Sequence, residues 1–313
     1  MASPLSDDPF PVLTVPDDAT QHFEPLGTKD KFWFDDAASG RNGLFKRTRP
    51  ETGEDWAECV VADVAAALGL PHADYDLALH RGERGVVSWN FLTGDQLLLH
   101  GNEILGRSDH SYDGASGPAV SRRNPYHTVR RVLGACSIVT AVPPAADAAI
   151  ARGDDTMVGY LLLDALVCNT DRHHENWAWV VDPEARLAYL APTFDHGSSL
   201  GRNESDEKRL RRLRSRDQGF TVRAYALRAK SGLFGGSTGD REPAQLRAMD
   251  AFRAAARLRP AAARCWLKRL EVVDDEELRR IARRVPRSVG SEVVSDFAGT
   301  MMSCTRADLL KTT

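Results

Sequence analysis

One stretch of this 313-residue chain decides its fold, and it reads Asn169-Thr170-Asp171-Arg172-His173-His174-Glu175-Asn176. An apolar run over residues 157–168, with Asp164 as its one charged residue, comes directly before it. The run predicts a buried helix whose N-cap is Asp154, Asp155 or Thr156. We therefore expect the eight residues to form a polar loop that this helix holds in place.

The loop carries residue types that phosphoryl transfer needs. That reaction requires an oriented nucleophile, a metal ion on the phosphates and a cation that absorbs developing charge. Asp171 follows the helix on a loop, where a carboxylate can orient a hydroxyl and accept its proton, so we interpret it as the base. Asn176, five residues later, can aim a neutral oxygen at a metal ion.

A second metal ligand is predicted from strand spacing. Two strand-like runs, residues 177–181 and 187–190, flank the turn Asp182-Pro183-Glu184-Ala185. A hairpin symmetric about that turn would bring Asn176 and Asp195 to neighbouring strands at its open end, roughly 5 Å apart. Their two oxygen ligands would then converge on Mg²⁺.

The N-terminal part supplies the cation. Residues 31–47 read as strand, turn and strand around Ser39-Gly40-Arg41-Asn42-Gly43, residues 53–68 have helical periodicity, and residues 75–79 and 85–92 read as two more strands. Lys46 follows the glycine-containing turn and can reach the α- and β-phosphates of ATP. Glu58 on the helix can pair with Lys46 and fix its position.

These motifs resemble a known family. The pattern Asn-x-Asp-Arg-His-x-x-Asn, followed by Pro192-Thr193-Phe194-Asp195-His196-Gly197-Ser198-Ser199, is similar to the catalytic core of HipA-like Ser/Thr kinases. The similarity spans about residues 31–200. It implies Asp171 as catalytic base, Asn176 and Asp195 as magnesium ligands and Lys46 as the nucleotide lysine. It further implies a phosphate loop that contains Ser39, Gly40 and Gly43, with Ser39 as a candidate for autophosphorylation.

The expected fold is α+β and bilobal, as in protein kinases. An irregular lead-in over residues 1–27 precedes a small β-rich lobe over residues 28–93 and a larger, mainly helical lobe over residues 94–313. The second lobe should contain the catalytic loop, the metal-binding hairpin and C-terminal helices over residues 243–258, 261–270, 275–284 and 292–310. Residues 106–124 read as a loop, and residues 125–138 and 145–151 as helices. The resemblance places ATP and Mg²⁺ in the cleft between the lobes.

Bulk properties limit the partners. The net charge is −3, no window is apolar enough to span a membrane, and the N-terminus lacks a signal peptide, so we expect a cytoplasmic protein without membrane contact. Residues 208–216 are basic and could bind an acidic peptide, tRNA or a phosphorylated segment, or form a solvated helix face. The family's toxin has an extra N-terminal subdomain and an antitoxin partner. This chain starts almost at the kinase lobe, which argues against a toxin role and leaves an antitoxin partner open.

Alternatives remain for the phosphate acceptor and for the class of reaction. A protein or peptide Ser or Thr is the expected acceptor, but the Asp-His-Gly pattern is also similar to phosphoinositide kinases, so a lipid or small molecule remains an alternative. A pseudokinase that uses nucleotide only to stabilise a binding shape is a second alternative. A metal-dependent hydrolase built on Asp171, His173, His174 and Asp195 is a third. Against the hydrolase, we expect His173 to pack and His174 to be exposed.

Overall fold

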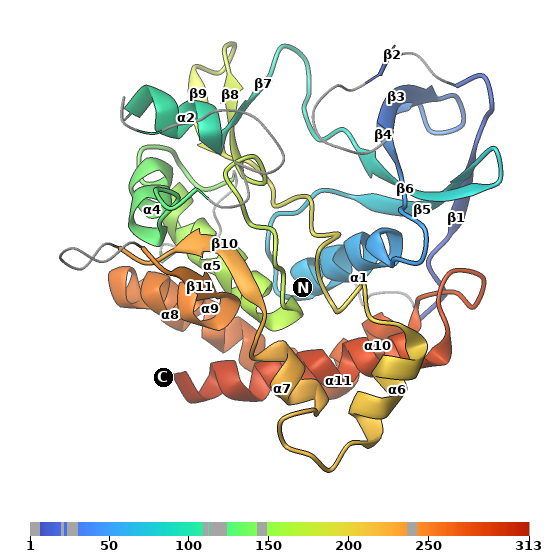
Figure 1. Ribbon diagram of the computed structural model, residues 1–313. Coiled ribbons are helices and arrows are strands. Elements are labelled where there is room, and N and C mark those ends of the chain that lie inside the picture. The colour runs from blue at the N-terminus through green and yellow to red at the C-terminus, as the bar shows by residue number, and fades with distance from the viewer. Residues whose placement is uncertain are drawn as a thin grey trace.

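A computed structural model of the chain describes residues 7–19, 22–23, 31–108, 112, 124–142, 149–236 and 243–312. It has two parts, a curled β-sheet formed by the N-terminal residues and a mainly helical part formed by the rest (Figure 1). The two parts meet along α1 (Glu54–Ala67), which lies beneath the sheet. The expected α+β architecture is confirmed.

The sheet has six strands in the order β1-β5-β6-β4-β3-β2. Their bounds are Val12–Val15, Tyr75–His80, Glu83–Trp89, Arg41–Arg47, Lys31–Asp36 and His22–Phe23 in that order. β1 pairs with β5 in parallel, and every other pair is antiparallel. The hairpins expected at residues 31–47 and 75–92 are confirmed as β3–β4 and β5–β6.

Alternation of side chains gives the sheet two different faces. Phe45 and Val87 belong to an aromatic cluster on one face, together with Phe32, Phe34 and Trp89. Leu77 and Val86 point to the opposite face, where they join the main core with Val60 and Val64 of α1. Lys46 follows Phe45 along β4, so its side chain leaves the sheet on the α1 side.

The helical part is built around α5 (Gly153–Val167), all of whose residues are buried. The helices α4 (Val129–Cys136), α8 (Ala248–Leu258) and α9 (Pro260–Val272) pack against it. A three-stranded sheet of β7 (Leu97–His100), β8 (Ala178–Asp182) and β9 (Leu187–Leu190) adjoins α2 (Gly101–Ser108) and α5. No described helix is long and apolar enough to cross a membrane.

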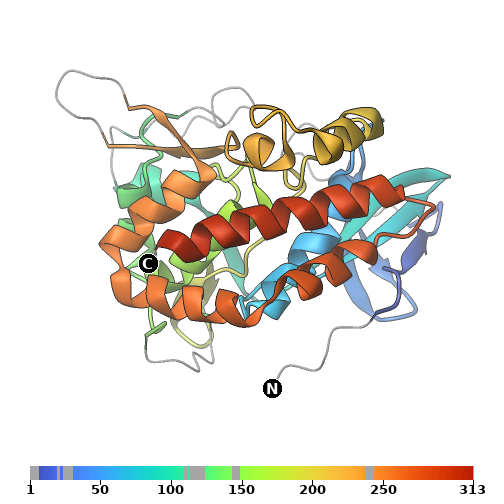
Figure 2. The ribbon, with the colours of Figure 1, turned by 90° about the horizontal axis from the view of Figure 1, so that it is seen from below.

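The C-terminal helix α11 (Glu292–Leu309) lies across the lower side of the molecule (Figure 2). It contacts α5 and α10 (Asp275–Arg283), and also α6 (Asp206–Arg214) and α7 (Val222–Ala226). The ribbon of β10 (Lys230–Phe234) and β11 (Gln245–Arg247) leads from α7 into α8. A short 3₁₀ helix, Leu310–Thr312, ends the described chain.

Three sequence expectations need correction. The N-cap of α5 is Arg152, whose backbone N–H donates to the carboxylate of Asp155 at 3.1 Å, because this carboxylate can reach back from the third helical position. The helix predicted from residue 243 starts at Ala248, because the preceding residues pair with β10. The loop predicted at 106–124 begins with the last turn of α2 and otherwise lies largely outside the described residues, as does the helix predicted at 145–151.

Two helix glycines test the packing of the core. A Cβ at Gly159 of α5 would lie 2.6 Å from Leu70 Cδ2 and 2.6 Å from Trp266 Cε2, whereas one at Gly134 of α4 meets no described atom within 4 Å. We expect Gly159→Ala to lower the free energy of unfolding by about 1–3 kcal/mol, since overpacking outweighs helix propensity. Gly134→Ala should raise it by up to about 1 kcal/mol. Urea unfolding measures both, and a stabilised Gly159→Ala variant would contradict this packing.

Candidate active site

The loop after α5 begins with a change of backbone direction. Cys168 adopts the left-handed conformation with φ 56° and ends the helix. Asn169 then donates its side-chain N–H to Asp164 Oδ1 at 2.8 Å and accepts the backbone N–H of Asp171 on its own Oδ1 at 3.0 Å. The octet is therefore a loop, as expected, and Asp164 inside α5 fixes where it starts.

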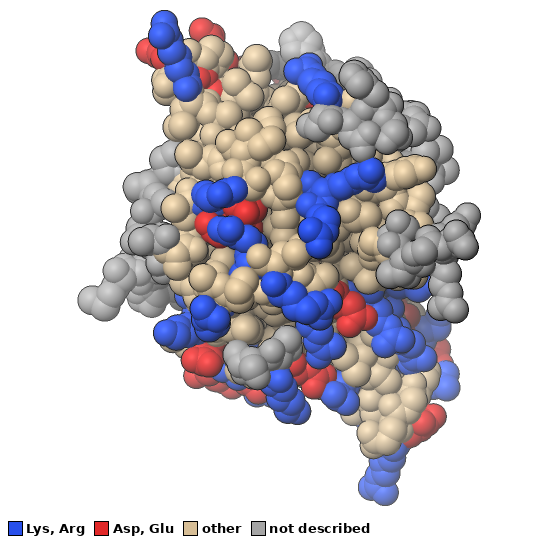
Figure 3. All heavy atoms as spheres, turned by 90° about the vertical axis from the view of Figure 1, so that its left-hand side faces the viewer, with Lys and Arg blue, Asp and Glu red and all other residues tan. Residues whose placement is uncertain are grey.

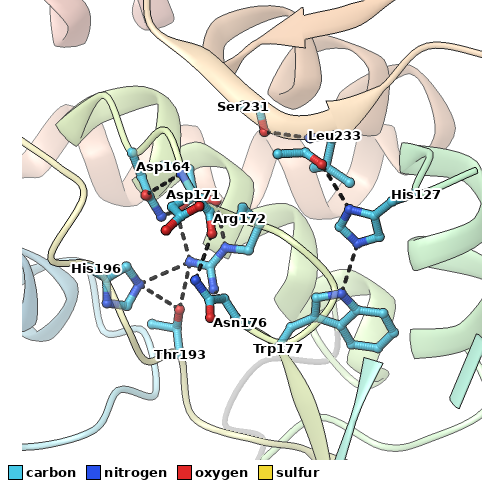
Figure 4. A network of polar contacts seen from close by, with 12 residues as sticks. His127, Asp164, Asp171, Arg172, Asn176, Trp177, Thr193, His196, Ser231 and Leu233 are labelled. Atoms are coloured by element: carbon cyan, nitrogen blue, oxygen red, sulfur yellow. Dashed lines mark hydrogen bonds and ion pairs between the residues drawn. The ribbon is translucent and has the colours of Figure 1, made fainter. Parts of the chain in front are cut away.

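Arg172 forms the centre of a buried network under this loop (Figure 4). Its guanidinium donates to both carboxylate oxygens of Asp164, with Nε–Oδ2 2.7 Å and Nη2–Oδ1 2.8 Å, and each of the two side chains is 1% exposed. Nη1 donates to the carbonyl of Asn176 at 2.6 Å. Burial alone lowers the pKa of Arg172, but Asp164 together with Tyr160 and Asp195 outweighs it and raises the pKa, so the guanidinium stays charged.

The same guanidinium ties the loop to the segment that carries Asp195. Arg172 Nη2 donates to Thr193 Oγ1 at 3.0 Å and to His196 Nε2 at 3.0 Å. Burial and the charge of Arg172 hold the pKa of His196 well below its usual value. His196 is therefore neutral, and its Nε2 is the acceptor. One arginine thus positions both halves of the sequence motif.

Asp171 and Asn176 are held relative to each other. The Asn176 side-chain N–H donates to the carbonyl of Asp171 at 2.7 Å, so the amide oxygen of Asn176 is directed away from that carbonyl. Ser198 Oγ donates to Asp171 Oδ2 at 3.4 Å, and the Asp171 side chain is 19% exposed. Asp171 therefore presents its carboxylate at a partly open position beside Ser198.

The predicted hairpin is present, but its register differs from the expectation. Asp182 pairs with Leu187 and Trp179 pairs with Leu190, which places Thr193 rather than Asp195 opposite position 176. The cause is a four-residue turn in which Asp182 Oδ1 accepts the N–H of Ala185 at 2.8 Å, while Arg186 takes φ 50°. Asp195 is therefore positioned by its own contacts and not by the strand ladder.

Asp195 lies at the junction of the two parts of the chain. Lys46 Nζ lies 3.7 Å from Asp195 Oδ1, and the side chains are 13% and 39% exposed. Burial by itself lowers the pKa of Lys46, but Asp195 and Glu58 outweigh it and the net pKa is raised. The Asp195 N–H donates to Tyr75 Oη at 2.9 Å, and Asp195 takes φ 58°. Lys46, Glu58 and Asp195 are thus brought together.

Glu58 has a structural contact beside its charge on Lys46. The backbone N–H of His196 donates to Glu58 Oε2 at 2.6 Å, and Glu58 is 1% exposed. A Cβ at Gly197 would lie 3.2 Å from Glu58 Oε1 and 3.3 Å from the carbonyl of Glu54, so a larger residue there would push α1 away. Glu58 therefore sets the position of the segment that carries Asp195.

The predicted phosphate loop is the tight β3–β4 turn. Ser39 Oγ donates to Asp36 Oδ2 at 2.5 Å, and Gly40 takes φ 68°, a conformation that glycine adopts readily. Gly43 lies within β4, where a Cβ would be 2.8 Å from Val87 Cγ1. Packing against the aromatic cluster explains Gly43, while phosphate contact by Ser39, Gly40 and Gly43 stays a prediction.

Within the described residues, His173, His174 and His196 do not form a hydrolytic metal centre. His174 is fully buried and its Nδ1 lies 2.5 Å from Tyr112 Oη, so the expectation of an exposed His174 was wrong. Burial and the neighbouring His173 lower its pKa to about 4. Across the described ranges, no group of three or more His, Cys, Asp or Glu residues is placed to hold a metal ion.

Strand β10 supports the loop in a way the sequence did not suggest. A Cβ at Gly232 would lie 2.6 Å from the Arg172 carbonyl oxygen, so the strand passes backbone against backbone. His127 accepts the Trp177 indole N–H on Nε2 at 3.1 Å, and its Nδ1 lies 3.0 Å from the Gly232 carbonyl oxygen. Burial lowers the pKa of His127 to about 3, so it is neutral and Nδ1 donates. These contacts fix β10 beside the loop (Figure 4).

Other supporting residues were also missed. Asp164 gave a usable signal, since a carboxylate inside a buried helix requires a cationic or hydrogen-bonding partner. Arg172 belongs to the motif but had no predicted role, although a buried arginine is a suitable partner for a buried carboxylate. Tyr75 offered no local signal, because its contact with Asp195 joins residues far apart in the sequence.

Two arginines of the basic segment 208–216, Arg209 and Arg212, contact the rest of the chain, whereas its other Lys and Arg residues are exposed. Arg209 is buried, donates to Asp206 at 2.8 Å and lies over the Trp56 ring at 5.8 Å. Arg212 donates to Glu204 at 2.8 Å.

On the face formed by α2, α4 and α8, the described Lys and Arg side chains occur in separate groups, some beside acidic ones, rather than as a continuous basic surface (Figure 3).

Comparisons with known proteins identify the fold. No protein-family model and no curated protein matches the chain. Among solved structures it is similar to the Helicobacter pylori proinflammatory kinase CtkA, with a TM-score of 0.70, 17% identity and 97% of each chain covered. It is also similar to Shewanella oneidensis MR-1 HipA, from a complex with HipB and operator DNA, with a TM-score of 0.56, 12% identity, and 92% of this chain and 64% of that chain covered. The chain therefore has the fold of HipA-like kinases.

The Asp164–Arg172 pair should be strongly coupled. Asp164→Leu or Arg172→Met leaves one buried charge without its partner, and we expect each to lower the free energy of unfolding by about 3–5 kcal/mol. The double variant should cost less than the sum of the two, by more than about 1 kcal/mol. Urea unfolding measures all three. Asp74→Ala, at the exposed Arg41–Asp74 pair, is the control and should cost no more than about 1 kcal/mol. Additive losses in the buried pair would contradict the coupling.

Proposed function

We propose that the protein is an ATP- and Mg²⁺-dependent phosphotransferase that moves the γ-phosphate of ATP to a hydroxyl, namely Ser or Thr of a protein or peptide. One observation carries the proposal. Two segments far apart in the sequence bring Lys46 within 3.7 Å of Asp195, while a single buried arginine ties the Asp195 segment to the loop that bears Asp171. A cation, a carboxylate and a base on one framework are the parts that phosphoryl transfer requires.

The residues present fit magnesium. Asp195 has a carboxylate that is 39% exposed, and Asn176 has an amide whose nitrogen is already engaged with Asp171, which leaves its oxygen for a cation. Mg²⁺ takes oxygen ligands and keeps several waters, so two protein ligands are enough when phosphate oxygens complete the set. Bound Mg²⁺ would neutralise phosphate charge and orient the γ-phosphate.

The nucleotide lysine and the base follow from position. Lys46 is charged and largely buried on the α1 side of the sheet, so its ammonium is preorganised for phosphate oxygens. Ser39 and Gly40 at the β3–β4 turn would lie nearer the terminal phosphates. Asp171 would orient the acceptor hydroxyl and receive its proton, and Ser198 holds the Asp171 carboxylate in place.

Other acceptors and a non-catalytic role are separable by experiment. A lipid or small-molecule hydroxyl would use the same nucleotide site. A pseudokinase would bind nucleotide without turnover, so ADP formation with an acceptor present distinguishes it from a phosphotransferase. Neither structural neighbour identifies the acceptor or partner of this chain.

Substitution of the proposed base gives the direct test. Asp171→Asn keeps the size of the side chain but removes the proton acceptor, so we expect label transfer from γ-labelled ATP to host-lysate proteins to fall by about 10²- to 10⁴-fold. Nucleotide binding, measured by calorimetry, should be retained. Asp250→Asn on α8, half-exposed and paired with Arg253, is the control and should transfer label as the wild type does. Full transfer by Asp171→Asn would overturn the assignment.

A further inference from the structure

The structure has a pocket beside the proposed base. It has a volume of about 590 Å³, and its lining includes Thr170 and Ser198. Thr170 precedes Asp171 in the chain, and Ser198 donates to the Asp171 carboxylate at 3.4 Å. Ser198, three residues after the proposed metal ligand Asp195, therefore lies in the pocket wall. An acceptor whose hydroxyl meets Asp171 would place its neighbouring residues here.

The pocket is basic. Arg202, Arg212, Arg228 and Lys230 line it, and no acidic residue is among the described lining. Arg202 pairs with Glu54 and Arg212 with Glu204, so half of this charge is compensated from outside the pocket. Burial, with the charge of Arg49, lowers the pKa of Arg202 to about 10. The remaining charge comes from Arg228 and Lys230.

Arg228 and Lys230 supply the uncompensated charge. Arg228 donates to the carbonyls of Ala224 at 2.9 Å and Gly219 at 2.7 Å, which fixes the guanidinium without neutralising it. Neither Arg228 nor Lys230 forms an ion pair with the described part of the chain, and both are exposed. Lys230 begins β10, the strand that Gly232 and His127 fix against the catalytic loop.

Arg212 forms part of the pocket wall. Its guanidinium lies 4.4 Å from the Phe220 ring centroid and 4.6 Å from that of Tyr225, both of which also line the pocket. Its Nη1 is buried and has no hydrogen-bond partner in the described part of the chain. Because this atom is not accessible and Arg212 is paired with Glu204, Arg212 shapes the wall and is not one of the cations open to a peptide.

We propose that this pocket is an acceptor subsite for acidic peptides, in which Asp or Glu side chains close to the phosphorylated Ser or Thr bind Arg228 and Lys230. The inference rests on the proposed function and adds a substrate class to it. A sphere of this volume is about 10 Å across, which about three extended residues span at about 3.3 Å each. The acidic residues should therefore lie within about three positions of the hydroxyl.

The test compares two peptides and two charge-matched variants. One heptapeptide has a central Ser flanked by three Glu on each side, and the other has Gln in place of every Glu. We expect the wild type to phosphorylate the Glu peptide with a kcat/KM at least about tenfold above that of the Gln peptide, a factor that corresponds to 1.4 kcal/mol. Arg228→Gln with Lys230→Gln should bring the ratio close to one, mainly through KM. Arg264→Gln with Lys268→Gln removes one Arg and one Lys from exposed positions on α9 and should keep the ratio.

Binding without ATP separates the two proposals. Calorimetry should show the Glu peptide binding the wild type and the Arg264, Lys268 variant, with affinity about tenfold lower for the Arg228, Lys230 variant. Equal kcat/KM for both peptides, or equal loss in the two variants, would overturn the subsite while label transfer still supported a phosphotransferase. Peptide binding without any label transfer or ADP formation would instead overturn the proposed function. If tRNA, but not the Glu peptide, bound at this pocket, the pocket would be assigned to nucleic acid. That result would contradict the proposal.

Discussion

The buried ion pair between Asp164 and Arg172 is the constraint on which the candidate site depends. Asp164 lies in the apolar second half of a helix whose residues are all buried, where an isolated carboxylate would be costly. The charge of Arg172 compensates this carboxylate. The same guanidinium donates hydrogen bonds to Asn176, Thr193 and His196. The helix, the loop and the following hairpin are therefore fixed relative to one another by one guanidinium. A buried pair therefore performs the positioning, while Asp171 and Asp195 keep partly exposed carboxylates at the surface of the site.

Much of the fold could be predicted because its elements have strong local signals. The helix at α1 differs by one residue at each end from its prediction, since its apolar periodicity ends at Leu68 and Gly69. The β8–β9 hairpin was predicted, but not its register, because register depends on turn geometry at Asp182 and Arg186 that composition does not reveal. The buried position of His174 depends on Tyr112 and could not be inferred from local pattern.

In the candidate site, too, residues within motifs could be predicted, whereas residues that act through distant contacts could not. Asp171, Asn176, Asp195, Lys46 and Glu58 were selected from motifs, and the structure places Lys46 beside Asp195 and Asn176 beside Asp171. The supporting residues Tyr75, Thr193 and Gly232 act through contacts between distant segments, so no local pattern marks them. The pocket cations were missed for the same reason. Arg202, Arg228 and Lys230 come from outside the basic run that drew attention to this region.

A structure with Mg²⁺ and a non-hydrolysable ATP analogue would test the account most directly. We expect Mg²⁺ about 2.0–2.1 Å from oxygens of both Asn176 and Asp195. Lys46 should contact the α- and β-phosphates, with the γ-phosphate facing Asp171. Nucleotide bound away from Lys46, or a metal ion that neither Asn176 nor Asp195 contacts, would contradict the account.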